Sequence, residues 1–98
     1  MELIKADGFE WDWGNQEKNN LSHGVTWEEA EEVFKMVPLL MFTDDKHSKD
    51  EIREGVYGKT SKNQLLVIIY TVRYNKIRII SARDQNKREK MFYKKYEK

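Results

Sequence analysis

The clearest hydrophobic pattern of the chain lies in its last third, where two apolar runs flank a short polar turn. The first run covers residues 65–73, the second covers 77–83, and the turn is Tyr74-Asn75-Lys76. Runs rich in β-branched residues that are separated by two or three turn-forming residues predict a β-hairpin. Both runs are apolar at successive positions, which is typical of strands in the middle of a sheet that is covered on both faces.

A helical pattern precedes the hairpin. Thr26 and Glu29 have the spacing of a capping box, in which each side chain accepts a hydrogen bond from the other residue's backbone. Apolar residues then recur every three or four positions and predict one buried helix face, and Pro38 ends the helix. The residues of this face are Trp27, Ala30, Phe34 and Val37.

A weaker pattern near the start predicts a short strand and another helix. Residues 9–11 alternate like an edge strand. Asp12 is a suitable N-cap for a helix over about 13–22, and Gly24 is well placed to stop it. This helix has few apolar residues, chiefly Trp13 and Leu21.

The last helix of the chain is predicted by a second capping box. Asn86 and Glu89 resemble the Thr26 pair and open a helix that runs to about Tyr96. We expect this helix to dock on the rest of the domain through Met91, Phe92 and Tyr96.

The remaining apolar runs predict two more strands. One covers residues 39–42 and the other covers 51–57, with a polar loop over 44–50 between them. The predicted order is β-α-α-β-β-β-β-α, with two N-terminal helices and a C-terminal helix. We therefore predict an α+β fold around a mainly antiparallel sheet, in a single domain over residues 1–98.

The composition excludes several classes of site. The chain has no cysteine, so it forms neither a disulfide nor a thiolate zinc site. Two histidines, His23 and His47, are too few for a metal cluster, and we expect neither a metal nor a cofactor. The N-terminus lacks the layout of a signal peptide, and no apolar run approaches the roughly 20 residues of a membrane span. We therefore expect a soluble cytoplasmic protein.

The net charge of +1 conceals a strong segregation of charge along the chain. Residues 1–50 hold five lysines and twelve acids, a net charge of −7, whereas residues 51–98 hold thirteen basic residues and five acids, a net charge of +8. Such asymmetry favours a polyanion-binding surface on the second half. The alternative is a solvated surface whose two halves neutralise each other in the fold.

Four arginines lie on the predicted strands of the second half. An arginine in a central strand needs a partner, because a buried unpaired charge is costly. The partner is either an acidic residue of the first half or an anion from outside, and the planar guanidinium binds phosphate with two parallel hydrogen bonds. The four candidate catalytic arginines are Arg53, Arg73, Arg78 and Arg83.

The register of the hairpin decides which arginines share a face. With a two-residue turn, Arg73 pairs with Lys76 and Thr71 with Arg78, so Arg73 and Arg78 share one face. Arg83 then lies on the other face with Tyr70 and Ser81. A three-residue turn would instead place Arg73 with Ser81 and Arg83. We favour the first register.

His23 is a candidate base or acid, because its ordinary pKa suits proton transfer near neutrality. The alternative for His23 is structural, since a histidine before a C-capping glycine meets the carbonyl end of a helix favourably.

Several motifs, in order along nearly the whole chain, resemble one known family. They are Phe9-x-Trp11-Asp12, His23-Gly24-Val25, Glu28-Glu29-Ala30, Tyr70-Thr71-x-Arg73, Ile77-Arg78-Ile79-Ile80-Ser81-Ala82-Arg83 and Arg88-Glu89. Together they are similar to the BrnT family, bacterial toxins of type II toxin–antitoxin pairs.

The resemblance implies a fold similar to RelE-type ribonucleases and an endoribonuclease that blocks translation. It also implies a BrnA-like antitoxin that neutralises the toxin and represses their shared operon, so that contact with DNA is only indirect. The family commonly has basic residues where this chain has Asn15 and Ser22. If those positions contact RNA, Lys18 is the nearby replacement. The further candidate RNA-binding residues are Lys76, Lys87 and Arg88.

These observations favour a toxin that cleaves RNA at an arginine-rich site on the central sheet, without a metal. The alternative is a binding module for nucleic acid or protein that retains the toxin fold without its activity. No glycine-rich phosphate loop, nucleophile elbow or metal motif supports a small-molecule enzyme.

Overall fold

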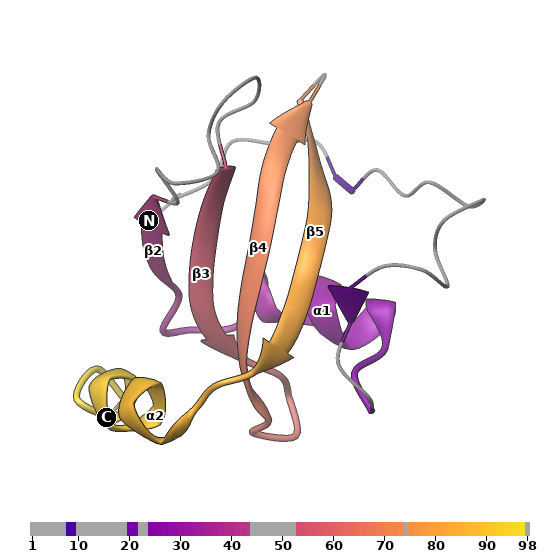
Figure 1. Cartoon of the computed structure of the whole chain (residues 1–98). Coiled ribbons are helices and arrows are strands. Elements are labelled where there is room, and N and C mark those ends of the chain that lie inside the picture. Colours follow the sequence, from indigo (N-terminus) through magenta and orange to yellow (C-terminus); the bar gives the residue numbers. More distant parts are fainter. Residues whose placement is uncertain (1–7, 10–19, 22–23, 44–52, 74, 98) are drawn as a thin grey trace.

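The computed structural model describes residues 8–9, 20–21, 24–43, 53–73 and 75–97. Within them, one sheet has the strand order β1-β5-β4-β3-β2, and two helices flank it (Figure 1). Strands β2 to β5 are antiparallel, which confirms the predicted α+β class and the mainly antiparallel sheet. The elements are β1 (Asn20–Leu21), α1 (Trp27–Val33), β2 (Leu40–Thr43), β3 (Arg53–Lys59), β4 (Leu65–Arg73), β5 (Lys76–Asp84) and α2 (Lys87–Lys94).

Within the described residues, the number and order of the helices do not match the predicted β-α-α-β-β-β-β-α arrangement exactly, nor the RelE-like order expected with it. Asn20 and Leu21 do not continue a helix. They form β1 and pair in parallel with Ser81 and Ala82 of β5. Residues 13–19 and 22 of the predicted helix lie outside the described residues. The edge of β5 offers backbone groups that need partners, and a helix with so few apolar residues competes poorly with that pairing.

Phe9 also lies beside β5. It makes an isolated parallel bridge with Ile77, and the Ile77 N–H donates a hydrogen bond of 2.8 Å to the carbonyl of Gly8. The Phe9 ring meets the edge of Phe34 at a centroid distance of 5.5 Å. Phe9 thus contributes to the core, while the rest of the predicted strand 9–11 lies outside the described residues.

The first capping box is confirmed. The Thr26 N–H donates to the Glu29 carboxylate at 2.9 Å, and the Glu29 N–H donates to the Thr26 hydroxyl at 3.1 Å. Helix α1 ends at Val33, earlier than Pro38, because the next three N–H groups bond to carbonyls three positions back and tighten the last turn. Val37 is 77% exposed, so its predicted place in the core is wrong, and Val33 is buried instead.

The hairpin of β4 and β5 has the shorter of the two predicted turns. Arg73 pairs with Lys76 and Thr71 pairs with Arg78, which confirms the favoured register. Asn75 in the turn has a φ of 61°, a left-handed conformation that asparagine tolerates better than most residues.

The main core lies on one face of the sheet, which we call the core face. Helix α1 covers this face, behind the sheet in Figure 1, and most side chains between them are fully buried. The fully or nearly fully buried strand residues of this face are Val56, Leu66, Ile68, Tyr70, Ile77, Ile79 and Ala82. The opposite face is only partly covered: Val67 is buried but Ile69 is half-buried. The predicted cover on both faces is thus complete on the core face and partial on the other.

Helix α2 begins as predicted but is anchored differently. The Asn86 N–H donates to Glu89 at 2.9 Å and the Glu89 N–H donates to the Asn86 side chain at 2.8 Å, so the second capping box is confirmed. The anchor is Tyr93, which is fully buried and donates a hydrogen bond from its hydroxyl to the carbonyl of Pro38. Burial raises the pKa of Tyr93 to about 12.

The three predicted anchors of α2 are all partly exposed, although the ring of Phe92 does contact Tyr57 of β3. The exposed fractions are 64% for Met91, 42% for Phe92 and 51% for Tyr96, and the helix ends at Lys94. A hydroxyl that reaches a carbonyl while its ring is buried makes Tyr93 the better anchor. The rings of Phe92 and Tyr96 thereby remain partly exposed.

Candidate functional site

Two of the candidate arginines flank one residue in a straight row across three strands. Arg53 of β3 pairs with Thr71 of β4, and Thr71 pairs with Arg78 of β5. Paired residues of antiparallel strands have Cα atoms about 5 Å apart, so the two arginines start roughly 10 Å apart on the same face. We call this the arginine row, and its face the arginine face. Thr71, 3% exposed, lies at the centre of the row.

The next row toward the hairpin turn adds further positive charge. Arg73 pairs with Lys76, and Lys76 is exposed. The position of Arg73 has the same strand parity as Thr71, while its side chain lies outside what the structure describes. Arg78 is half-buried and makes no ion pair with any residue in the described ranges. The hairpin end of the arginine face therefore concentrates cationic positions.

A β-bulge brings Arg83 to the same face, which corrects the prediction that it lies opposite Arg78. Tyr70 pairs with Ile79 and Ile69 pairs with Ser81, so Ile80 is an extra residue on β5. The extra residue reverses the alternation of side chains beyond it. Arg83 then pairs with Val67, whose other partner across the sheet is Tyr57.

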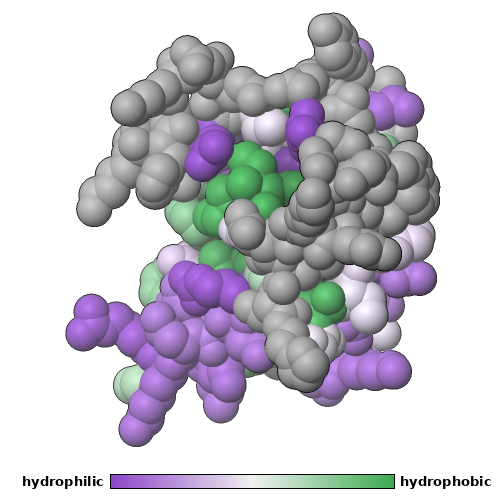
Figure 2. Space-filling model, turned by 45° about the vertical axis from the view of Figure 1, so that its right-hand side comes forward, coloured by the Kyte–Doolittle hydropathy of each residue, from purple (hydrophilic) through white to green (hydrophobic). Residues whose placement is uncertain are grey.

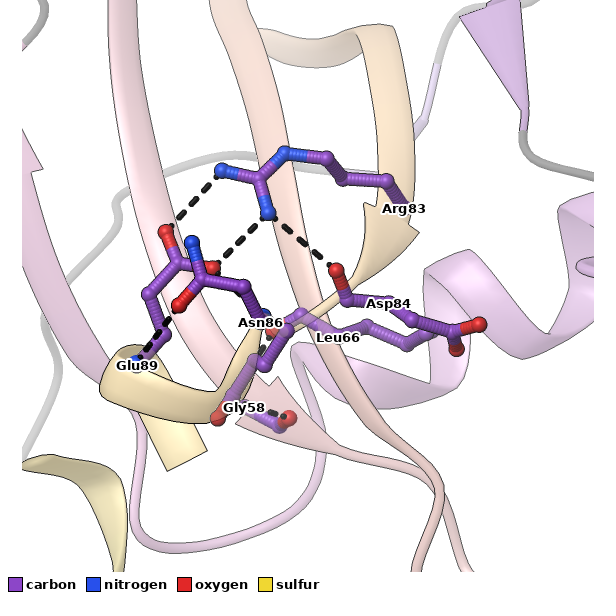
Figure 3. Close-up of polar contacts among 7 residues, drawn as sticks. Gly58, Leu66, Arg83, Asp84, Asn86 and Glu89 are labelled. Carbon is purple, nitrogen blue, oxygen red and sulfur yellow. Dashed lines mark hydrogen bonds and ion pairs between the residues drawn. The ribbon is translucent and has the colours of Figure 1, made fainter. Parts of the chain in front are cut away.

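Arg83 is engaged by helix α2. Its two terminal nitrogens donate to the two carboxylate oxygens of Glu89 at 2.8 and 2.9 Å, and one of them also donates to the carbonyl of Asp84 at 3.1 Å (Figure 3). The hydrogen bonds from Arg83 lower the pKa of Glu89, and the same carboxylate raises the pKa of Arg83. In this conformation the guanidinium fork already holds a carboxylate, so a phosphate would have to compete for it.

Tyr57 lies beside this ion pair. Burial raises the pKa of Tyr57, the negative charge of Glu89 raises it further, and the positive charge of Arg83 opposes that effect. Its ring contacts Phe42 on one side and Phe92 on the other. Tyr57 thus connects the arginine face to α2.

Comparison with known protein families decides the assignment of the chain. The family model described as the ribonuclease toxin BrnT of type II toxin–antitoxin systems matches residues 11–89. The chain belongs to the BrnT family. The sequence resemblance is therefore confirmed, and the chain is a ribonuclease toxin whose partner is an antitoxin protein. No curated protein matches the chain.

The remaining candidate residues of this BrnT toxin are partly outside the described ranges. Lys18 and His23 lie there, so their roles stay predictions. Lys87 and Arg88 occupy the first turn of α2 and are exposed. The structure thus brings Arg53, Arg78 and Lys76 together, and it places Lys87 and Arg88 on the helix beside the other end of the sheet.

Two residues beside the candidate arginines were not anticipated from the sequence. Thr71 lies between two arginines, and the predicted register already paired it with one of them. Glu89 was identified only as a cap, because sequence spacing shows its bonds within the helix but not its contact with Arg83 six residues earlier.

Among the described residues, no three His, Cys, Asp or Glu side chains are grouped so that they could hold a metal ion. Within the same ranges, no helix is long and apolar enough to cross a membrane.

Proposed function

We propose that the chain is an endoribonuclease that holds the scissile phosphate of RNA at the arginine row and cleaves the strand without a metal ion. The observation that carries this proposal is the alignment of Arg53, Thr71 and Arg78 across three neighbouring strands. Two guanidinium groups that converge from both sides can each donate two hydrogen bonds to a phosphate.

The reaction is an internal transfer. The 2′-oxygen attacks the phosphorus, its proton passes to a base, and the 5′-oxygen leaves with a proton from an acid, which produces a 2′,3′-cyclic phosphate. Arg53 and Arg78 stabilise the negative charge that grows on the phosphate oxygens. His23 remains the proposed residue for proton transfer. Lys18, Lys76 and Arg73 would bind the neighbouring backbone phosphates.

The same proposal covers the cellular role. Cleavage of RNA inhibits translation in the cytoplasm, and a BrnA-like antitoxin neutralises the toxin by covering the arginine face. The net charge of +8 on residues 51–98 supports an acidic segment of the antitoxin as the occupant. Contact with operator DNA is made through the antitoxin alone.

The test is cleavage of total RNA by the purified protein in EDTA, with analysis of the new 3′ ends. We expect 2′,3′-cyclic phosphates, and Arg53→Ala and Arg78→Ala should each lower the rate by about tenfold or more. Lys62→Ala is the matched control, because Lys62 is an exposed cation in the turn between β3 and β4. An absolute requirement for a divalent ion would refute the metal-free mechanism.

A binding module without activity is the second candidate. The engagement of Arg83 by Glu89 favours it, because one of the four arginines is already neutralised. This alternative predicts that the protein binds RNA, that Arg78→Ala weakens binding, and that no product forms under any ionic condition.

A further inference from the structure

Four aromatic rings follow one another from the arginine face onto helix α2. The ring centroids of successive members are 4.8, 5.8 and 5.4 Å apart, so each ring contacts the next. We call this series the aromatic ladder. Its members, in spatial order, are Phe42, Tyr57, Phe92 and Tyr96.

The ladder begins beside the arginine row. A Cβ atom at Gly55 would overlap Cζ of Phe42, so the Phe42 ring occupies the space above Gly55 that a side chain would otherwise fill. Gly55 is two residues from Arg53 on β3, a distance of about 7 Å along the strand. The first ring therefore lies close to the proposed phosphate site.

The far end of the ladder is exposed, and basic residues lie near it in the sequence. Phe92 is 42% and Tyr96 is 51% exposed. Arg88 precedes Phe92 by four residues, so the two share one side of α2, and the ring of Tyr96, just beyond the helix end, contacts the ring of Phe92. Lys95 adjoins Tyr96 and is exposed as well. In Figure 2, a hydrophobic patch (green) near the centre lies directly above a hydrophilic region (purple) at the lower left.

We infer that the aromatic ladder stacks the bases of an unpaired RNA strand whose scissile phosphate lies at the arginine row. Bases of a single strand expose faces that stack on aromatic rings, and basic residues beside the rings bind the backbone. Bases in a duplex are already stacked and paired, so the site selects unpaired RNA. This inference rests on the proposed function and adds the class of substrate and its path.

The chemistry of α2 favours bases over a protein segment. Besides its rings, the helix offers only one apolar side chain, Met91, and it lacks the leucine or β-branched residues of an apolar docking groove. Exposed rings with the basic residues Arg88 and Lys95 nearby in the sequence suit a nucleic acid strand, whose bases stack on rings and whose phosphates bind basic side chains.

The experiment measures the affinity of the whole protein for a single-stranded 2′-O-methyl oligonucleotide, which cannot be cleaved because its 2′-oxygen is blocked. Phe92→Leu and Tyr96→Leu remove the ring but keep an apolar side chain, and each should weaken binding by about tenfold. Met91→Leu is the control on the same helix and should leave affinity unchanged. Thermal melting of each variant verifies that it is folded.

A second oligonucleotide, with the same backbone but no bases, separates the contribution of base stacking from that of the backbone charge. The wild type and Phe92→Leu should bind this strand with equal, weak affinity. An equal loss on both strands, or no loss on either, would overturn the inference. So would a Phe92→Leu variant that binds RNA normally but has lost affinity for the antitoxin, since the rings would then be a protein-docking surface. Because the ligand is not cleaved, base-dependent binding can hold even if the cleavage test in EDTA fails.

Discussion

Glu89 has two structural tasks, and substitutions can separate them. Its carboxylate accepts a hydrogen bond from the Asn86 N–H at the start of α2, and it also accepts hydrogen bonds from both terminal nitrogens of Arg83. Glu89→Gln keeps an oxygen for the helix cap but removes the charge that binds Arg83. Glu89→Ala removes both interactions.

The exposure of the two side chains sets how much stability the ion pair contributes. The Arg83 side chain is 48% exposed and that of Glu89 is 16% exposed, so solvent weakens the ion pair to about 0.5–1 kcal/mol. Loss of the cap costs about 1 kcal/mol more. We expect Glu89→Gln to lower the free energy of unfolding by about 0.5–1 kcal/mol and Glu89→Ala by about 2 kcal/mol. In a domain of 98 residues the larger loss lowers Tm by roughly 8–16 °C.

The stability that the Glu89 carboxylate contributes also depends on pH. The folded protein holds the pKa of Glu89 below its ordinary value of 4.5, mainly through the hydrogen bonds from Arg83. A group with a depressed folded pKa stabilises the protein above its unfolded pKa, and this contribution is lost as the pH falls through the folded pKa. The difference between wild type and Glu89→Gln should therefore be full at pH 7 and should shrink below pH 4.5.

Urea denaturation at a series of pH values measures this difference. Glu28→Gln is the matched control, because Glu28 is an exposed glutamate in the first turn of α1. Its substitution should change stability by less than about 0.5 kcal/mol at any pH. A Glu89→Gln variant as stable as wild type at pH 7, or a deficit that persists unchanged in acid, would refute a stabilising ion pair between Glu89 and Arg83.

Two further substitutions test the packing. Tyr93→Phe removes the hydrogen bond to Pro38 and should lower the free energy of unfolding in urea by about 1 kcal/mol; an unchanged value would mean that the hydroxyl contributes nothing to the anchor. Gly55→Ala places a methyl group where the Phe42 ring lies and should lower the free energy of unfolding by about 1–3 kcal/mol. Adding Phe42→Leu to this variant should restore most of the lost stability. A double variant that melts no higher than Gly55→Ala would contradict the contact.

Local patterns predicted most of the regular structure. Both capping boxes are present, because their four hydrogen bonds join residues only three positions apart. The hairpin register followed from the length of its turn. The pairing of Thr71 with Arg78, which is one half of the arginine row, could therefore be predicted from the residues of the hairpin itself.

Features set by contacts distant in sequence were not predicted. Asn20 and Leu21 form a strand because β5, some sixty residues later, offers an edge to pair with. Tyr93 is the anchor of α2 because its hydroxyl reaches Pro38, 55 positions earlier in the chain. The bulge at Ile80 lies within residues 77–83, where no glycine or proline marks it. In each case the deciding partner was not in the local sequence window.

The bulge at Ile80 decides which side chains of β5 lie on which face of the sheet. Residues before and after it alternate in opposite phase, so the five-residue interval from Arg78 to Arg83 returns to the same face instead of the opposite one. If Ile80 were instead paired in a regular ladder, Arg83 would lie opposite Leu66 and point into the packed core, where an unpaired charge costs several kcal/mol. Deletion of Ile80 should therefore be tolerated, because it joins the two existing registers directly, whereas an inserted residue must either enlarge the bulge or turn Arg83 inward. The spacing of residues 78–83 is thus as much a part of the arginine face as the arginines themselves.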